Sequence, residues 1–440
     1  MSQSNRVIFY FALVAILFLL EGLTNFWIFT GSWDTSVSIL NMALVSAVMA
    51  LGVNLQWGYA GLFNVGIMGF TALGGLAVVI TSMQPVGEAW EAGGARVLAG
   101  LLIGALTIGL TIMLRTKLPK GNARAVFTIV VLVGGFFIYR SVFDPGVEAI
   151  EAVNPSVAGY LGGLGLPVLL SWPVGGLLAA GAAWIIGKTA LGLRSDYLAI
   201  ATLGIAEIIV AVIKNEGWLS RGAKNVNGLP RPVPNPVDLQ ADPAFIEAAA
   251  NFGLGPVEAS TLYIKLGYAL LFTAVLVIVL ILAQLARHSP WGRMMRAIRD
   301  NETAARAMGK NVTARHLQIF ILGSAICGIA GAMMTTLDGQ LVPTTYNPLR
   351  FTFLIWVMVI VGGSGNNIGS LLGAFLIWWL YVKVEPMGQW LAQISTAGLD
   401  PNNWFAVRMT DAAPHMRLFT MGLILLLVLR FNPRGLVPEK

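Results

Sequence analysis

The chain has 440 residues, of which 56% are apolar and 11% are charged, and its mean hydropathy is +0.75. Soluble domains usually carry about 25% charged residues, so this composition excludes a set of soluble domains and indicates a polytopic membrane protein. The net charge of +7 lies in short loops between apolar runs, which is typical of cytoplasmic membrane loops and not of a nucleic-acid-binding surface. Cys327 is the only cysteine, which excludes an internal disulfide and a multi-cysteine metal site.

Apolar runs that suit a membrane helix of roughly 20 residues occur at 7–30, 37–55, 64–83, 95–114, 125–142, 173–187, 197–215, 261–286, 314–336, 350–382 and 416–430. We expect the first run to be retained, because it is longer than the core of a signal peptide. Run 350–382 is too long for one span and is expected to enter the membrane and return. The Gly-rich run 157–170 is expected to be re-entrant or interfacial. The sequence therefore predicts an all-α fold, with one transmembrane domain over 1–440 and about ten to twelve helices, some of them broken.

Charge placement predicts the orientation. Basic residues gather at 115–124, at 287–315 and in the tail after 430, whereas acidic residues mark 88–91 and 144–151. Basic loops favour the cytoplasmic side. We therefore expect both termini in the cytoplasm, and loops 216–260 and 383–415 outside.

Two Gly/Asn-rich interruptions lie inside apolar regions, at 57–64 and 362–368. Paired interruptions of this kind are typical of discontinuous helices at a transport site. The abundance of glycine, 50 residues in all, is an equally simple explanation.

Three polar residues are candidates for a translocation pathway. Glu207 lies within an apolar run, where an ionised carboxylate is costly unless it is paired or hydrated. Asn54 and Asn64 are amides between apolar neighbours, and amides can contact either charge of a zwitterion. The alternative for Glu207 is a structural carboxylate, and for the asparagines it is hydrogen bonding between helices.

The basic stretch 288–310 is the strongest local signal. Pro290 is suited to begin a helix there, and Gly309 to end it. Such a helix can lie against another protein, or it can be a juxtamembrane linker held at lipid headgroups.

Within that stretch the spacing of Thr303-Ala304-Ala305, Gly309 and Ile319 resembles the "EAA" signature of ATP-binding cassette importer permeases. In that signature the first position is usually acidic; here it is threonine and Glu302 precedes it. Further stretches resemble the branched-chain amino acid permease family, LivM-like membrane subunits in particular. They are LQWGYAG at 55–61, RSDYLAIATLG at 194–204, GGSG at 362–365 and NPRGL at 432–436.

The resemblance implies that the helix around 288–310 couples the permease to an ATPase, with Glu302, Thr303, Ala304, Ala305 and Gly309 in contact. It implies a second, LivH-like permease, two ATP-binding subunits and an external or periplasmic substrate-binding protein, in a bacterial cytoplasmic membrane. ATP and Mg²⁺ are expected on the partners, because Gly187-Lys188-Thr189 lacks the earlier glycine of a P-loop, Ala182 standing there instead.

The expected function is import of branched-chain or similar amino acids. Import of urea, short amides or organic acids by a permease of the same family is an alternative, and an ion-coupled secondary transporter is a second one. No catalytic residue or metal site is expected in this chain.

Overall fold

The computed structural model describes residues 3–155, 159–400 and 403–439. In these ranges ten helical segments are long and apolar enough to cross a membrane, and the all-α, polytopic prediction is confirmed. Their helices are α1 (Gln3–Leu23), α2 (Trp33–Asn54), α5 (Ala95–Lys117), α6 (Asn122–Ala152), α7 (Ser171–Ala190), α8 (Ser195–Asn215), α12 (Pro256–His288), α15 (Val312–Asp338), α17 (Asn367–Ser395) and α19 (Met416–Phe431). Two shorter apolar helices, α3 (Ile67–Ser82) and α16 (Leu354–Gly362), complete the bundle.

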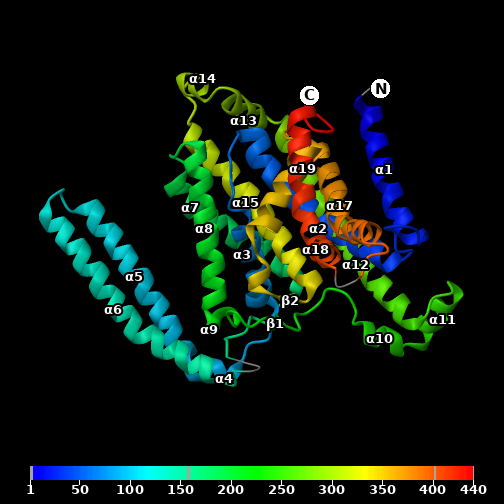
Figure 1. The fold of residues 1–440 in the computed structure, drawn as a ribbon. Helices are drawn as coiled ribbons and strands as arrows, with labels where there is room; N and C mark the ends of the chain where they lie inside the picture. The colour runs from blue at the N-terminus through cyan, green and yellow to red at the C-terminus, as the bar shows by residue number, and fades with distance from the viewer. Residues whose placement is uncertain (1–2, 156–158, 401–402, 440) are drawn as a thin grey trace.

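The core of the bundle is built around α2, α3 and α15 (Figure 1). Helix α2 is buried along most of its length, as expected of a helix that is apolar on every side. It contacts α12, α16 and α17, while α3 and α15 pack against α7. Backbones approach closely because small residues line the contacts: a Cβ atom on Gly74 would lie 1.9 Å from the Gly328 carbonyl oxygen.

Both expected interruptions are present. Helix α2 passes into a π-helical turn, Leu55–Tyr59, and the chain is not helical again until α3 begins. On the other side, α16 ends at Gly362, and α17 begins after a tight turn. Gly363 and Gly365 have φ values of +118° and +83°, a region that disfavours side chains. Run 350–382 thus forms two packed helices, α16 and α17.

Helices α5 and α6 form a hairpin that leans away from the bundle (Figure 1). Its base, near α4 (Gly87–Ala89) and α9 (Gly217–Ser220), joins it to the other elements. Only 17% and 6% of the apolar windows of its two arms are buried. Apolar side chains on nearly every side of both arms indicate contact with lipid acyl chains.

The two segments expected outside both contain regular secondary structure. Segment 216–260 contains α9, α10 (Pro236–Ala241), α11 (Pro243–Asn251) and β1 (Val226–Asn227), which pairs antiparallel with β2 (Gln340–Leu341). Segment 383–415 is not a loop throughout, because α17 continues to Ser395 and α18 (Trp404–Ala412) follows. Residues 401–402 lie outside the described ranges.

The predicted re-entrant run 157–170 is an irregular stretch followed by α7, with residues 156–158 outside the described part. Leu164 and Leu166 donate backbone hydrogen bonds to Ile80 and Thr81 of α3, at 2.9 and 3.0 Å. The stretch therefore satisfies carbonyl groups that the end of a helix leaves without partners.

Candidate functional site

Residues 288–310 form two helices rather than the single one predicted: α13 (Pro290–Asp300) and α14 (Glu302–Ala307). Asn301 separates them because its backbone is extended, at φ −155°. Its side chain accepts a 2.9 Å hydrogen bond from the Ala304 N–H and so caps α14. The sequence motif therefore encodes a sharp corner between two short helices.

Helix α14 lies at the extreme end of the molecule, the end at which both termini also lie (Figure 1). Glu302, Thr303 and Ala304 are exposed, and Ala305 is half-buried against the rest of the chain. Glu302 pairs with Arg306 at 2.6 Å, one turn away. Gly309 follows the helix with φ +76°, and a Cβ atom there would meet no described residue within 4 Å apart from its two chain neighbours. The residues predicted to couple thus form a projecting surface.

Helix α13 connects that surface to the membrane helices. It buries Met295 and Ile298 and contacts α12 and the π-helical turn Leu55–Tyr59. From its last turn the half-buried Arg299 donates to the Gly58 carbonyl oxygen and forms an ion pair with Glu439, Nη1 to Oε2 at 2.7 Å. Partial burial lowers the pKa of Arg299, but the carboxylates of Glu439 and Asp300 outweigh it and raise the pKa above its ordinary value.

The C-terminal tail runs along the second interruption. Leu436 and Val437 donate backbone hydrogen bonds to Val361 and Gly362, at 2.8 and 3.0 Å. The Asn366 amide donates to the Pro438 carbonyl oxygen at 3.2 Å. The conformation of the α16–α17 turn therefore depends on the tail.

A buried polar cluster joins the two interruptions. The Asn367 Oδ1 atom accepts hydrogen bonds from Asn54 Nδ2 at 2.9 Å and from Tyr59 Oη at 2.7 Å. Asn64, in turn, donates to Gln56 Oε1 at 2.9 Å, and its backbone carbonyl accepts from Trp356 Nε1. Asn54 and Asn64 are 0% and 1% exposed. This geometry favours the alternative of hydrogen bonding between helices, and a pathway role for either remains a prediction.

Glu207 lies on the outward face of α8 and is exposed. Exposed neighbours on this face include Ile200 and Ile208, at 69% and 62%. Among the described residues no ion pair to Glu207 is formed, neither from Arg194 nor from Lys214. A carboxylate on a membrane helix is not stable against acyl chains. The face therefore requires water or another polypeptide beside it.

Sequence reasoning missed a buried ion pair between α1 and α17. Lys383 Nζ lies 2.6 Å from Glu21 Oε2, and the two side chains are 3% and 0% exposed. Thr30 also donates to Glu21, and Lys383 donates to the Ile28 carbonyl oxygen at 3.0 Å. The signal that could have revealed the pair was the carboxylate of Glu21 inside the predicted span 7–30. The sequence predicts Lys383 at the start of the outer loop 383–415, whereas α17 continues beyond it to Ser395.

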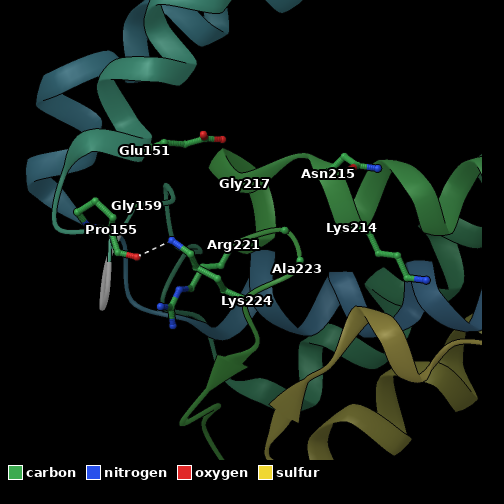
Figure 2. A pocket seen from close by; sticks show the side chains of 10 residues that line it. Glu151, Pro155, Gly159, Lys214, Asn215, Gly217, Arg221, Ala223 and Lys224 are labelled. Atoms are coloured by element: carbon green, nitrogen blue, oxygen red, sulfur yellow. Dashed lines mark hydrogen bonds between the residues drawn. The ribbon is translucent and has the colours of Figure 1, made fainter.

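A small polar cavity of about 240 Å³ lies at the opposite end of the bundle, beside α9. Figure 2 shows Arg221 and Lys224 near Pro155, with Lys224 Nζ donating to the Pro155 carbonyl oxygen at 2.9 Å. Glu151 and Lys214 lie on other sides of the cavity, apart from each other. Its charged groups do not converge on one point, as a solute-binding site would require.

Residues 122–429 match the family described as the branched-chain amino acid transport system permease component. The chain is 29% identical to the high-affinity branched-chain amino acid transport system permease protein LivM of Escherichia coli, over 53% of this chain and 54% of that protein. It is 25% identical to a probable LivM of Methanocaldococcus jannaschii, over 92% and 95% of the two chains. It is 25% identical to the fructose import permease protein FrcC of Rhizobium meliloti, over 67% of this chain and 76% of that protein.

The match to the Escherichia coli protein spans about half of that protein's length. No solved structure matches the chain. The family match covers well over half of the sequence, from the start of α6 into α19, with the projecting helix α14 and the second interruption inside it. This chain therefore belongs to the branched-chain amino acid transport system permease family.

Proposed function

We propose that this chain is a membrane subunit of an ATP-binding cassette importer that moves branched-chain amino acids into the cytoplasm. The observation that carries the proposal is helix α14, a capped, exposed helix at the end of the bundle, joined through α13 to the first interruption. A rigid exposed helix with small residues suits docking into a groove of another protein. The absence of a P-loop from the sequence agrees with ATP hydrolysis, and Mg²⁺ binding, on separate subunits.

A second permease subunit is supported by the outward face of α8. Glu207 needs a hydrated or protein environment at membrane depth, and a path between two permeases would provide it. An external substrate-binding protein completes the proposed assembly. In this arrangement the basic end, with α13, α14 and both termini, lies in the cytoplasm, and the membrane is the bacterial inner membrane.

The substrate class rests on the LivM names of two relatives. A relative named for fructose import shows that permeases similar to this chain also serve sugars. Buried apolar packing fills the centre of this chain, so selectivity would reside largely in the binding protein. Urea, short amides and organic acids are therefore tested beside leucine.

An ion-coupled secondary transporter receives less support. Such a carrier needs carboxylates that bind and release a cation in the membrane. The buried carboxylate of Glu21 is already paired with Lys383, which leaves Glu207 as the candidate that the sequence singled out.

The decisive test is gentle solubilisation of the tagged chain from its native membrane, followed by identification of co-purifying proteins and reconstitution into liposomes. We expect a second permease, two ATPase subunits and leucine uptake that requires ATP inside the liposomes together with the binding protein outside them. A chain that purifies alone and transports solute without ATP would overturn the proposal.

A further inference from the structure

Four segments that are distant in sequence meet around Arg299. They are the last turn of α13, the π-helical turn Leu55–Tyr59, the glycine turn before α17 and the C-terminal tail. The Arg299 guanidinium donates to Gly58 on one side and pairs with Glu439 on the other. A Cβ atom on Gly365 would lie 2.5 Å from Glu439 Oε2 and 3.2 Å from Arg299 Nη1. The two interruptions and the α13–α14 unit thus share one ion pair.

We propose that the Arg299–Glu439 ion pair is the element through which movement of α13 and α14 reaches both helix interruptions, so that these two residues position the membrane helices for transport. The proposal rests on the importer function proposed above. It adds that the C-terminal tail, through Glu439, takes part in coupling ATP hydrolysis to transport.

The geometry on each side of the pair supports a mechanical role. Gly58 lies in a π-helical turn at the end of α2, where carbonyl groups lack intrahelical donors, and its carbonyl group takes a donor from Arg299 on α13. Arginine suits this position because its planar guanidinium presents several donors in fixed directions. On the other side, the tail is bonded to Val361 and Gly362 of α16. A displacement of α13 therefore pulls on α2 directly and on α16 through the tail.

The environment of the pair strengthens it. The Arg299 and Glu439 side chains are 26% and 21% exposed, so the charges are screened less than those of a surface pair such as Glu302–Arg306, at 47% and 62%. Both lie beside a polar cavity that Arg293 and Arg296 also line. The pair is thus partly buried and borders a cavity lined by α13 and the tail.

The experiment uses the complex co-purified from its native membrane and compares Glu439→Gln, Arg299→Gln and the double variant with the unmodified protein. Leucine uptake and ATP hydrolysis are measured in the same proteoliposomes. We expect each single variant to assemble and to hydrolyse ATP, with uptake per ATP reduced about fivefold or more. If the residues act as one link, the double variant is no worse than the more impaired single variant.

Arg434→Gln is the matched control, because it removes an exposed charge from the same tail and no ion pair to it is formed among the described residues. We expect it to leave uptake per ATP unchanged. Equal uptake per ATP in Glu439→Gln and the unmodified protein would overturn the proposal, as would an effect of the same size in Arg434→Gln.

Hydrogen exchange separates this proposal from the choice of substrate. In the unmodified complex we expect ATP and vanadate to change amide protection at 55–66 and 362–369, and we expect Glu439→Gln to abolish that change. Hydrogen exchange can be measured even if leucine is not transported. If the unmodified complex takes up none of the tested solutes with ATP, that result argues against the proposed function and not against the role of the ion pair. An unaltered response in Glu439→Gln would show that the pair only stabilises the fold.

Discussion

Asn54 and Gly365 are 311 positions apart in the chain, yet Asn54 Oδ1 accepts a 2.8 Å hydrogen bond from the Gly365 backbone N–H. The Asn54 Nδ2 group donates at the same time to Asn367. One fully buried amide therefore holds the end of α2 against the turn that precedes α17. Removing it leaves a backbone donor without a partner inside the bundle.

Replacing Asn54 with alanine should destabilise the protein by about 2 kcal/mol, because buried donors and acceptors left unpaired cost about 1–3 kcal/mol each. The measurement is thermal unfolding in detergent, followed with a thiol-reactive dye. Cys327 is the single cysteine and is buried, so it reacts only when the core opens. As a control, Asn251→Ala, at an exposed position, should leave the unfolding midpoint unchanged. If Asn54→Ala also leaves the midpoint unchanged, the Asn54 amide does not hold the two segments together.

Lys383→Met should destabilise more strongly, by about 3–5 kcal/mol, because it leaves the Glu21 carboxylate buried without its cation. The double variant Glu21→Gln with Lys383→Met should recover much of that loss, since the uncompensated charge is gone. The same thiol assay measures both. A double variant as unstable as Lys383→Met would show that packing at α1, and not charge, explains the effect.

The fold followed from composition and hydrophobic runs, because a bilayer requires each span to satisfy its own backbone hydrogen bonds. Both interruptions were also predictable, since Gly and Asn at 57–64 and 362–368 stand out in apolar runs. That the two interruptions contact each other was not predictable. Nothing local in the sequence pairs Asn54 with Gly365, or Arg299 with a carboxylate 140 positions away, because such contacts depend on how helices pack.

The break between α13 and α14 at Asn301 was likewise not predictable from the sequence, although it depends on a short-range contact. A continuous helix from Pro290 to Gly309 fits the helical spacing of the apolar residues, and asparagine inside it is only mildly unfavourable. Asn301 instead caps a new helix by bonding Ala304. Side-chain bonding to the backbone competed with helix continuation and prevailed.

Gly309→Val should uncouple ATP hydrolysis from uptake, whereas Gly309→Asn should do so much less. Gly309 has φ +76°, a conformation that costs non-glycine residues about 1–2 kcal/mol and that asparagine tolerates best. Because no described residue other than its two chain neighbours lies within 4 Å of an added Cβ, a folded Val variant reports on backbone strain and on the docked partner. Uptake and ATP hydrolysis are measured together; equal coupling in both variants would show that this end of α14 is not a contact.

Glu207→Gln should reduce transport while leaving assembly with the second permease intact. The side chain is exposed on α8 and unpaired among the described residues, so neutralising it removes no bond within the chain and should not lower the unfolding midpoint. If the outward face of α8 lines a hydrated path, loss of the carboxylate alters the potential that a zwitterionic solute meets. Uptake should fall several-fold, because the free-energy change is roughly that of one charge–charge interaction in a partly hydrated site.

The control for that variant is Glu247→Gln, an exposed carboxylate on α11 outside the membrane-spanning helices, which should transport normally. Co-purification of the partner subunits distinguishes the two roles of α8. If Glu207→Gln fails to retain the second permease, the carboxylate belongs to a subunit contact. If it retains the partner and transports every tested solute at the unmodified rate, the carboxylate has no role in transport, and the path lies along another face of the bundle.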